Sequence, residues 1–189
     1  MNPFAQLFEM LISIYVSIIL LRFFLQYFRA DYYNPLSQFI VKATDPLVKP
    51  VRRIIPGLGG LDLSTLLVAW LVIVLKYTLV IGFNGQWGQI GILPLFLFSL
   101  INLLESVVGL FIFLIIIRVI MSWVAPQGGY NPVFMVIGQL TEPMMARARN
   151  ILPPMGGFDL SPMILLILLF FINSSISYYL YPLVSKLAN

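Results

Sequence analysis

The 189-residue sequence contains no cysteine and no histidine. Without cysteine there is no disulfide, no thiolate metal ligand and no thiol nucleophile. Without histidine, the chain lacks the most common metal ligand and the side chain that most often carries protons near neutral pH. A lipase-type Gly-x-Ser-x-Gly motif and a phosphate-cradling glycine loop are also missing. These absences exclude most enzyme mechanisms, so we expect a non-enzymatic protein without a cofactor or bound metal.

Charged residues are also scarce, at 10% of the chain, whereas 60% of the residues are hydrophobic. This leaves too little polar surface for a soluble domain of this length. A membrane-spanning helix needs about 20 apolar residues, and four stretches have that length: residues 6–27, 64–83, 101–123 and 161–181. Because isolated strands leave backbone groups unpaired in lipid, we predict an all-α membrane protein with four transmembrane helices.

The apolar run before the third stretch begins near Ile90 and is too long for one perpendicular crossing. We therefore interpret residues 90–100 as a lead-in. Pro94 suits the first turn of a short helix there, which would lie at the interface or join the span through a bend.

The chain repeats itself. A shift of 96 residues places Glu9 and Arg22 on Glu105 and Arg118. From residue 34 onward a shift of 97 aligns Asn-Pro, Thr-Asp/Glu-Pro and Gly-Gly-x-Asp-Leu-Ser motifs, at 34–35 and 131–132, 44–46 and 141–143, and 59–64 and 156–161. Each half consists of an apolar helix, a long polar connection and a second apolar helix. We therefore predict two parallel repeats, residues 1–89 and 90–189, with the same orientation in the membrane.

Basic residues predict the orientation. The long connections carry Arg29, Lys42, Lys49, Arg52, Arg53, Arg147 and Arg149, whereas residues 84–89 between the repeats carry none. The positive-inside rule places both connections in the cytoplasm of a bacterial inner membrane and both termini outside, although Lys186 argues against this. Because these residues flank the spans, we expect them to contact anionic lipid headgroups or a protein partner, and not nucleic acid.

The long connections show helical periodicity of apolar residues at 35–43, 46–55 and 141–152. Short amphipathic helices with basic residues lie in the headgroup region of membranes. We expect three such helices, which contact lipid or pack on the bundle, with docking of a protein partner as the alternative.

Four ionisable or polar residues inside the spans form a candidate cluster: Glu9, Glu105, Lys76 and Asn173. Glu9 and Glu105 are repeat equivalents, as are Lys76 and Asn173, and their positions predict a similar membrane depth. Intramembrane charges usually face the bundle interior and pair. The cluster is either a structural Glu9–Lys76 pair, a site for a cation or proton, or a contact for a partner.

Arg22 and Arg118 each end an apolar run, about 20 Å of helix beyond the acidic residue of the same span. We expect them to anchor the helices at the cytoplasmic interface. The alternative is contact with lipid phosphate or with Asp62 or Asp159. Ser64 and Ser161 are the predicted N-caps of the returning helices.

These repeated motifs resemble the YggT family of small integral membrane proteins, over nearly the whole chain. The resemblance implies an accessory factor, since bacterial members are linked to osmotic tolerance and plastid relatives to cytochrome assembly, and it supplies no catalytic residue. We therefore expect a scaffold or assembly and stress-tolerance factor in the membrane. The alternative is a cation channel or transporter, which four helices would form only as a homo-oligomer.

Overall fold

The computed structural model describes residues 2–57, 59–88, 90–124, 131–151 and 159–188. Its secondary structure is helical, in the order α1 (Pro3–Tyr27), α2 (Pro35–Ile54), α3 (Leu63–Phe83), α4 (Ile92–Val124), α5 (Pro132–Ile151) and α6 (Ser161–Ala188). Helices α1, α3, α4 and α6 are long and apolar enough to cross a membrane. The predicted all-α membrane fold with four spanning helices is therefore confirmed.

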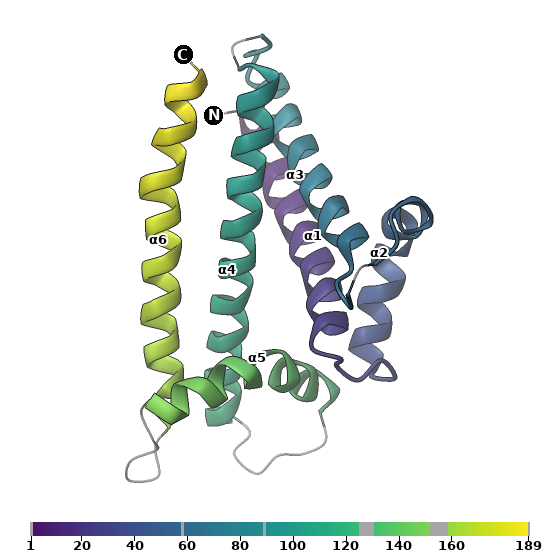
Figure 1. Cartoon of the computed structure of the whole chain (residues 1–189), viewed down its shortest axis with the longest axis vertical. Helices are drawn as coiled ribbons and strands as arrows, with labels where there is room; N and C mark the ends of the chain where they lie inside the picture. The colour runs from purple at the N-terminus through teal and green to yellow at the C-terminus, as the bar shows by residue number, and fades with distance from the viewer. Residues whose placement is uncertain (1, 58, 89, 125–130, 152–158, 189) are drawn as a thin grey trace.

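The four long helices run alongside one another, and α2 and α5 lie toward one end of the bundle (Figure 1). Both termini and the connection between α3 and α4 lie at the opposite end. The two long connections are thus on the same side of the bundle, as expected for repeats that share one orientation.

The predicted lead-in is not a separate helix. Helix α4 runs without interruption from Ile92 to Val124, and Pro94 falls in its first turn. A proline is tolerated there because the first backbone N–H groups of a helix need no intrahelical partner. With 33 residues, α4 is about 50 Å long and exceeds the hydrocarbon thickness of a bilayer.

The two short helices predicted at 35–43 and 46–55 are likewise one element, α2, which contains Pro46 and Pro50. Proline inside a helix removes a hydrogen bond and bends the helix. In Figure 1, α2 changes direction and its last turns are seen nearly end-on. The prolines therefore bend this helix around the bundle instead of dividing it.

The predicted apolar stripe of α2 is only partly buried. Ile40 and Val48 are in the core, whereas the side chains of Phe39 and Ile54 are 62% and 81% exposed. Helix α5 also begins earlier than predicted, at Pro132, and Leu152 at the end of the predicted range lies outside the described residues. Each connection thus packs one face on the bundle and leaves other apolar side chains uncovered.

Asp62, and not Ser64, is the N-cap of α3, because its carboxylate accepts a hydrogen bond from the backbone N–H of Thr65 at 3.2 Å. Ser64 lies inside the helix, where its hydroxyl donates to the carbonyl of Ile55. At the start of α6, the Asp159 carboxylate accepts from the backbone N–H of Ser161 at 2.9 Å. Both aspartates favour a helix start by placing a negative charge near its N-terminus.

The apolar core joins α1, α3, α4 and α5 through fully buried side chains such as Ile19, Ile73, Ile115 and Leu140. Helix α1 packs on α3, and α4 packs on α6. Between the repeats, α3 packs on α4, whereas the equivalent helices α6 and α1 do not pack together in their described parts. The second helix of the first repeat therefore packs on the first helix of the second repeat, but the reverse contact is not made in the described chain.

Candidate functional site

Lys76 lies in the middle of the bundle and is only 4% exposed. Its ammonium group donates to the Asn102 side-chain oxygen at 2.7 Å and lies 3.4 Å from the Ser13 hydroxyl. The lysine from α3 therefore binds polar groups of α1 and α4. Glu9 was the predicted partner of Lys76. The structure instead pairs Lys76 with Asn102, and Lys76 forms no ion pair with Glu9.

Glu105 belongs to a second group of polar contacts, between α4 and α6. Its two carboxylate oxygens accept hydrogen bonds from the Ser177 hydroxyl at 2.5 Å and the Tyr181 hydroxyl at 2.7 Å. Asn173 contributes its backbone carbonyl, which accepts from Ser177 at 3.2 Å. Glu9 and Glu105 still act on Lys76 through their charges, so the predicted residues share one region without forming a single hydrogen-bonded cluster.

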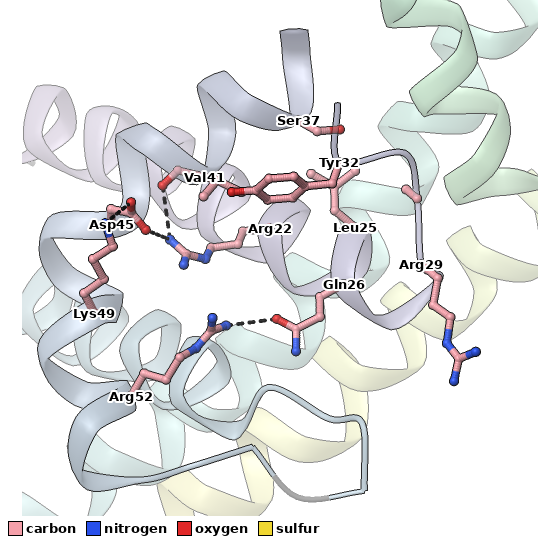
Figure 2. A pocket seen from close by; sticks show the side chains of 11 residues that line it. Arg22, Leu25, Gln26, Arg29, Tyr32, Ser37, Val41, Asp45, Lys49 and Arg52 are labelled. Atoms are coloured by element: carbon pink, nitrogen blue, oxygen red, sulfur yellow. Dashed lines mark hydrogen bonds and ion pairs between the residues drawn. The ribbon is translucent and has the colours of Figure 1, made fainter. Parts of the chain in front are cut away.

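The C-terminal end of α1 carries the most complete polar network. Arg22 is 5% exposed, and its guanidinium donates to the Asp45 carboxylate at 2.9 Å, the Thr44 hydroxyl at 2.9 Å and the Val41 carbonyl at 3.1 Å. Lys49 adds a second ion pair to Asp45 at 2.7 Å. Figure 2 shows Arg22 reaching from α1 to this acidic group on α2. Arg22 thus ties α1 to α2, whereas its predicted anchoring at the membrane interface stays a prediction.

The same network recurs in the second repeat. Arg118 of α4 donates to the Thr141 hydroxyl at 2.7 Å and to the Glu142 carboxylate at 2.6 Å. Thr141 is fully buried. The recurring Thr-Asp/Glu-Pro motif therefore serves to bind the recurring arginine, which attaches each connection helix to the preceding span.

A second arginine also recurs in both repeats, and it pairs with the aspartate at the start of the next span. Arg52 pairs with Asp62, and its repeat equivalent Arg149 pairs with Asp159 at 3.2 Å and with Glu142 at 2.9 Å. The predicted alternative, Arg22 or Arg118 on Asp62 or Asp159, is therefore wrong. Arg52 and Arg149, expected to contact lipid or a partner, hold the end of each connection helix to the start of the next span.

The charges in these networks are stable at neutral pH. Burial by itself raises the pKa of the Asp45 carboxyl, but hydrogen bonds from Lys49 and Arg22 outweigh it and hold that pKa below its usual range. For Glu142, the hydrogen bond from Arg149 lowers the pKa most, and Arg118 adds to the effect. Both carboxyls are therefore ionised partners for the arginines.

The remaining predicted contact residues are at the surface. The side chains of Lys42, Arg53 and Arg147 are exposed and take part in no ion pair among the described residues, and Lys49 is exposed although it pairs with Asp45. Lys42 and Arg53 lie on α2, and Arg147 lies on α5, which packs on α2. These three cations remain free to meet an anionic surface.

Thr44, Asp45, Thr141 and Glu142 are the site residues that sequence reasoning did not assign. Their signal was present, because the Thr-Asp/Glu-Pro motif and the arginine that ends the preceding span recur together. Asp45 follows Arg22 by 23 residues, so the pair depends on how α2 folds back along α1. All six ion pairs of the described chain lie within one repeat or the other.

A family model described as CCB3/YggT matches the chain twice, over residues 1–83 and 97–180. A protein of Vibrio alginolyticus, described only by its place in the proC 3′ region, is 44% identical over 174 residues, which cover 92% of each chain. An uncharacterized protein of Pseudomonas aeruginosa is 47% identical over 150 residues, covering 79% of this chain and 76% of its own. The uncharacterized protein YggT of Escherichia coli K12 is 37% identical over 178 residues, covering 94% and 90%. No solved structure matches. Two matches of the family model and long alignments to these relatives lead to one conclusion: the chain belongs to the CCB3/YggT family.

Proposed function

We propose that this protein is a non-enzymatic scaffold or assembly factor of the inner membrane, and that α2 and α5 form its cytoplasmic docking layer. The observation that supports this most is the repeated network of Arg22 and Arg118. In each repeat an ionised arginine ties the connection helix to its span, and a second arginine ties its far end. Such double attachment holds a peripheral helix in one position, as a docking surface requires.

The charge of this layer indicates an acidic partner or an anionic membrane surface. Lys42, Arg53 and Arg147 are exposed and are not needed for the internal ion pairs. Exposed cations contribute to the rate and specificity of association with a negatively charged surface. The excess of basic residues in both connections also supports a cytoplasmic position for them.

A photo-activated cross-linker at position 53 or 147 tests the scaffold function in cells. We expect one discrete cross-linked protein from these positions and none from position 75, a 53% exposed leucine of a membrane span. Arg53→Glu with Arg147→Glu should abolish the cross-link made from position 42, whereas the folded protein remains. The same cross-links from position 75, or their persistence after charge reversal, would contradict a basic docking layer.

The second candidate function is cation transport, which the charged groups around Lys76 favour. Two acidic residues, Glu9 and Glu105, lie near enough to the buried Lys76 to act on it electrostatically, so the region holds two carboxyl groups for one lysine. Against a pathway, Glu105 is already bound by Ser177 and Tyr181, and Lys76 by Asn102.

Flux measurements in liposomes separate the two functions. The scaffold proposal expects no potassium, sodium or proton flux above protein-free vesicles at several protein densities. A flux that is lost in the folded Glu9→Gln/Glu105→Gln variant would establish transport and overturn the scaffold.

A further inference from the structure

Helix α2 packs on α1, α3 and α5, but it buries only one side of its own surface. The buried residues recur every three or four positions, and a helix brings such positions onto one side. They are Ser37, Ile40, Thr44 and Val48. Much of the remaining surface of α2 is exposed, and it divides into two further sides that differ in chemistry.

The first exposed side of α2 is apolar. Its residues follow one another at spacings of seven, four and four positions, so they line up along the helix. This apolar side consists of Phe39, Pro46, Pro50 and Ile54, and all four are exposed. Exposed apolar side chains that line up in this way indicate contact with another apolar surface.

The second exposed side of α2 is basic. Lys42, Lys49 and Arg53 follow one another at spacings of seven and four positions, and all three are exposed. Lys49 pairs with Asp45, whereas Lys42 and Arg53 take part in no ion pair among the described residues. With 3.6 residues per turn, the basic side is next to the apolar side, and both point away from the buried side. Helix α2 therefore meets three different surroundings.

Pro46 and Pro50 restrict the depth at which α2 can lie. Proline has no N–H group, so the backbone carbonyls of Lys42 and Pro46 lose their helical hydrogen-bond donors. Such carbonyls are costly in the hydrocarbon core of a membrane, where no water replaces the missing donor. Both prolines are exposed. A position at the boundary between lipid and water satisfies the carbonyls and the apolar side chains together.

Helix α5 shows how the second repeat treats the equivalent side. Val136 stands at the position of Phe39 and is 1% exposed, against 62% for Phe39. Arg147 stands at the position of Pro50. Figure 1 shows α5 across the ends of the spanning helices, whereas α2 lies beside α1 and α3. The protein thus covers part of this side in α5 and leaves it uncovered in α2.

We propose that α2 lies in the membrane surface, with its apolar side in the lipid and its basic side toward the aqueous phase. Lipid is the surface that covers the apolar side, because α2 packs on two helices of spanning length and is therefore next to the bilayer. Amphipathic helices bury their apolar residues at the boundary between headgroups and acyl chains and keep their cations at the phosphates or in water.

This inference extends the proposed docking layer, on which it rests, by assigning the two exposed sides of α2. Phe39 and Ile54 contact lipid, and Lys42 and Arg53 are left for an acidic partner. Lipid contact and protein docking, which the sequence presents as alternatives, then occur together on different sides of one helix.

The absence of cysteine allows a single nitroxide label in the full-length protein. Four single-cysteine variants carry the label at position 39, 54, 42 or 53, in liposomes of phosphatidylethanolamine and phosphatidylglycerol. Electron paramagnetic resonance measures collisions of each label with oxygen, which concentrates in lipid, and with a nickel chelate, which stays in water. Leu75→Cys, at an exposed position of α3, is the reference for lipid, and Gln86→Cys, between α3 and α4, is the reference for water.

We expect the labels at positions 39 and 54 to lie about 5–10 Å inside the boundary between headgroups and acyl chains. Their ratio of oxygen to nickel collisions should be severalfold higher than the ratio at positions 42 and 53, which should resemble Gln86→Cys. All four native side chains are exposed, so the labels should leave the packing unchanged. Circular dichroism of each variant checks that it is folded.

Three results would overturn the inference. The first is a ratio at positions 39 and 54 as low as that of the water reference. The second is a low collision rate with both reagents at these positions together with spin–spin broadening, which would mean that a second copy covers the apolar side. The third is an equal, lipid-like ratio at all four positions, because the helix would then have no orientation at the membrane surface.

The scaffold function and this orientation fail in different experiments. Cross-links from position 53 or 147 can be absent although the labels at 39 and 54 are in lipid, and only the scaffold function is then refuted. Cross-links can also form although these labels are in water, and only the orientation of α2 is then refuted.

Discussion

Arg22 and Arg118 hold equivalent positions, but their ion pairs differ in burial. The side chains of Arg22 and Asp45 are 6% and 22% exposed, against 25% and 46% for Arg118 and Glu142. Removing one partner of a buried pair costs about 3–5 kcal/mol, and an exposed pair contributes about 0–1 kcal/mol. We expect Arg22→Ala to lower the free energy of unfolding by about 3 kcal/mol and Arg118→Ala by about 1 kcal/mol.

Unfolding of the purified protein in mixed micelles, followed by circular dichroism, measures both values. Arg22→Lys keeps the charge but loses the forked geometry and should fall between wild type and Arg22→Ala. Equal losses for the two alanine variants would contradict the inference that burial decides the strength of these ties.

The lowered pKa values of Asp45 and Glu142 predict how stability depends on pH. A carboxyl with a lower pKa in the folded state stabilises the fold above its unfolded pKa, and this stabilisation is lost as the pH falls through the folded pKa. The unfolded values are 3.8 and 4.5. We therefore expect a constant thermal midpoint from neutral pH down to about pH 5 and a decline below it.

Scanning calorimetry across this pH range measures the midpoint. Asp45→Asn/Glu142→Gln should start from a lower midpoint and decline less steeply, since two of the titrating groups are gone. A slope unchanged from wild type would show that other groups control the acid sensitivity.

At the scale of the element, the start of α3 depends on Asp62 for two separate contacts. The carboxylate caps the helix at Thr65 and pairs with Arg52. Asn is as good an N-cap as Asp but carries no charge. We expect Asp62→Asn to lose only the ion pair and Asp62→Ala to lose about 1 kcal/mol more, the typical contribution of a cap. Unfolding measurements on both variants separate the contacts, and equal losses would mean that the cap contributes nothing.

The spanning helices could be predicted from sequence because lipid imposes length and hydropathy on each of them. Their ends were predicted less well. Ser64 has the residue type of a cap, but Asp62 holds the cap geometry. Pro46 marks a helix end in most sequences, yet α2 continues through it because tertiary packing outweighs the lost hydrogen bond. The partner of Arg22 was not predicted, because reasoning within one helix cannot identify Asp45, which belongs to α2.

At the scale of the whole molecule, α3 packs on α4 where the repeats meet, whereas the equivalent helices α6 and α1 do not pack together in their described parts. Lys76 and Asn102 meet in this contact, and their repeat equivalents are Asn173 of α6 and Gln6 of α1. Two carboxamides can hydrogen-bond in lipid, where such contacts favour helix association. We expect α6 of a second copy to pack on α1 of the first. Asn173 and Gln6 would then form between two molecules the contact that Lys76 and Asn102 form within one.

The absence of cysteine makes this contact testable. With Gln6→Cys and Asn173→Cys in one chain, oxidation in membranes should give cross-linked dimers and larger species. Gln6→Cys with Leu168→Cys is the control, since Leu168 is a 49% exposed residue of the same helix. Equal cross-linking of both pairs would indicate random collision, and the contact would be refuted.

The distribution of the ion pairs also has a mechanical consequence. Every ion pair of the described chain joins parts of the same repeat, so each half is stiff within itself. Between the halves lie apolar surfaces and a few hydrogen bonds, such as that from Asn34 to the Pro132 carbonyl at 2.8 Å. In lipid, helices gain little from apolar burial alone, so packing and hydrogen bonds between helices hold such surfaces together. We therefore expect rotation of one half against the other to leave every ion pair intact and to be restrained mainly by the hydrogen bond from Lys76 to Asn102.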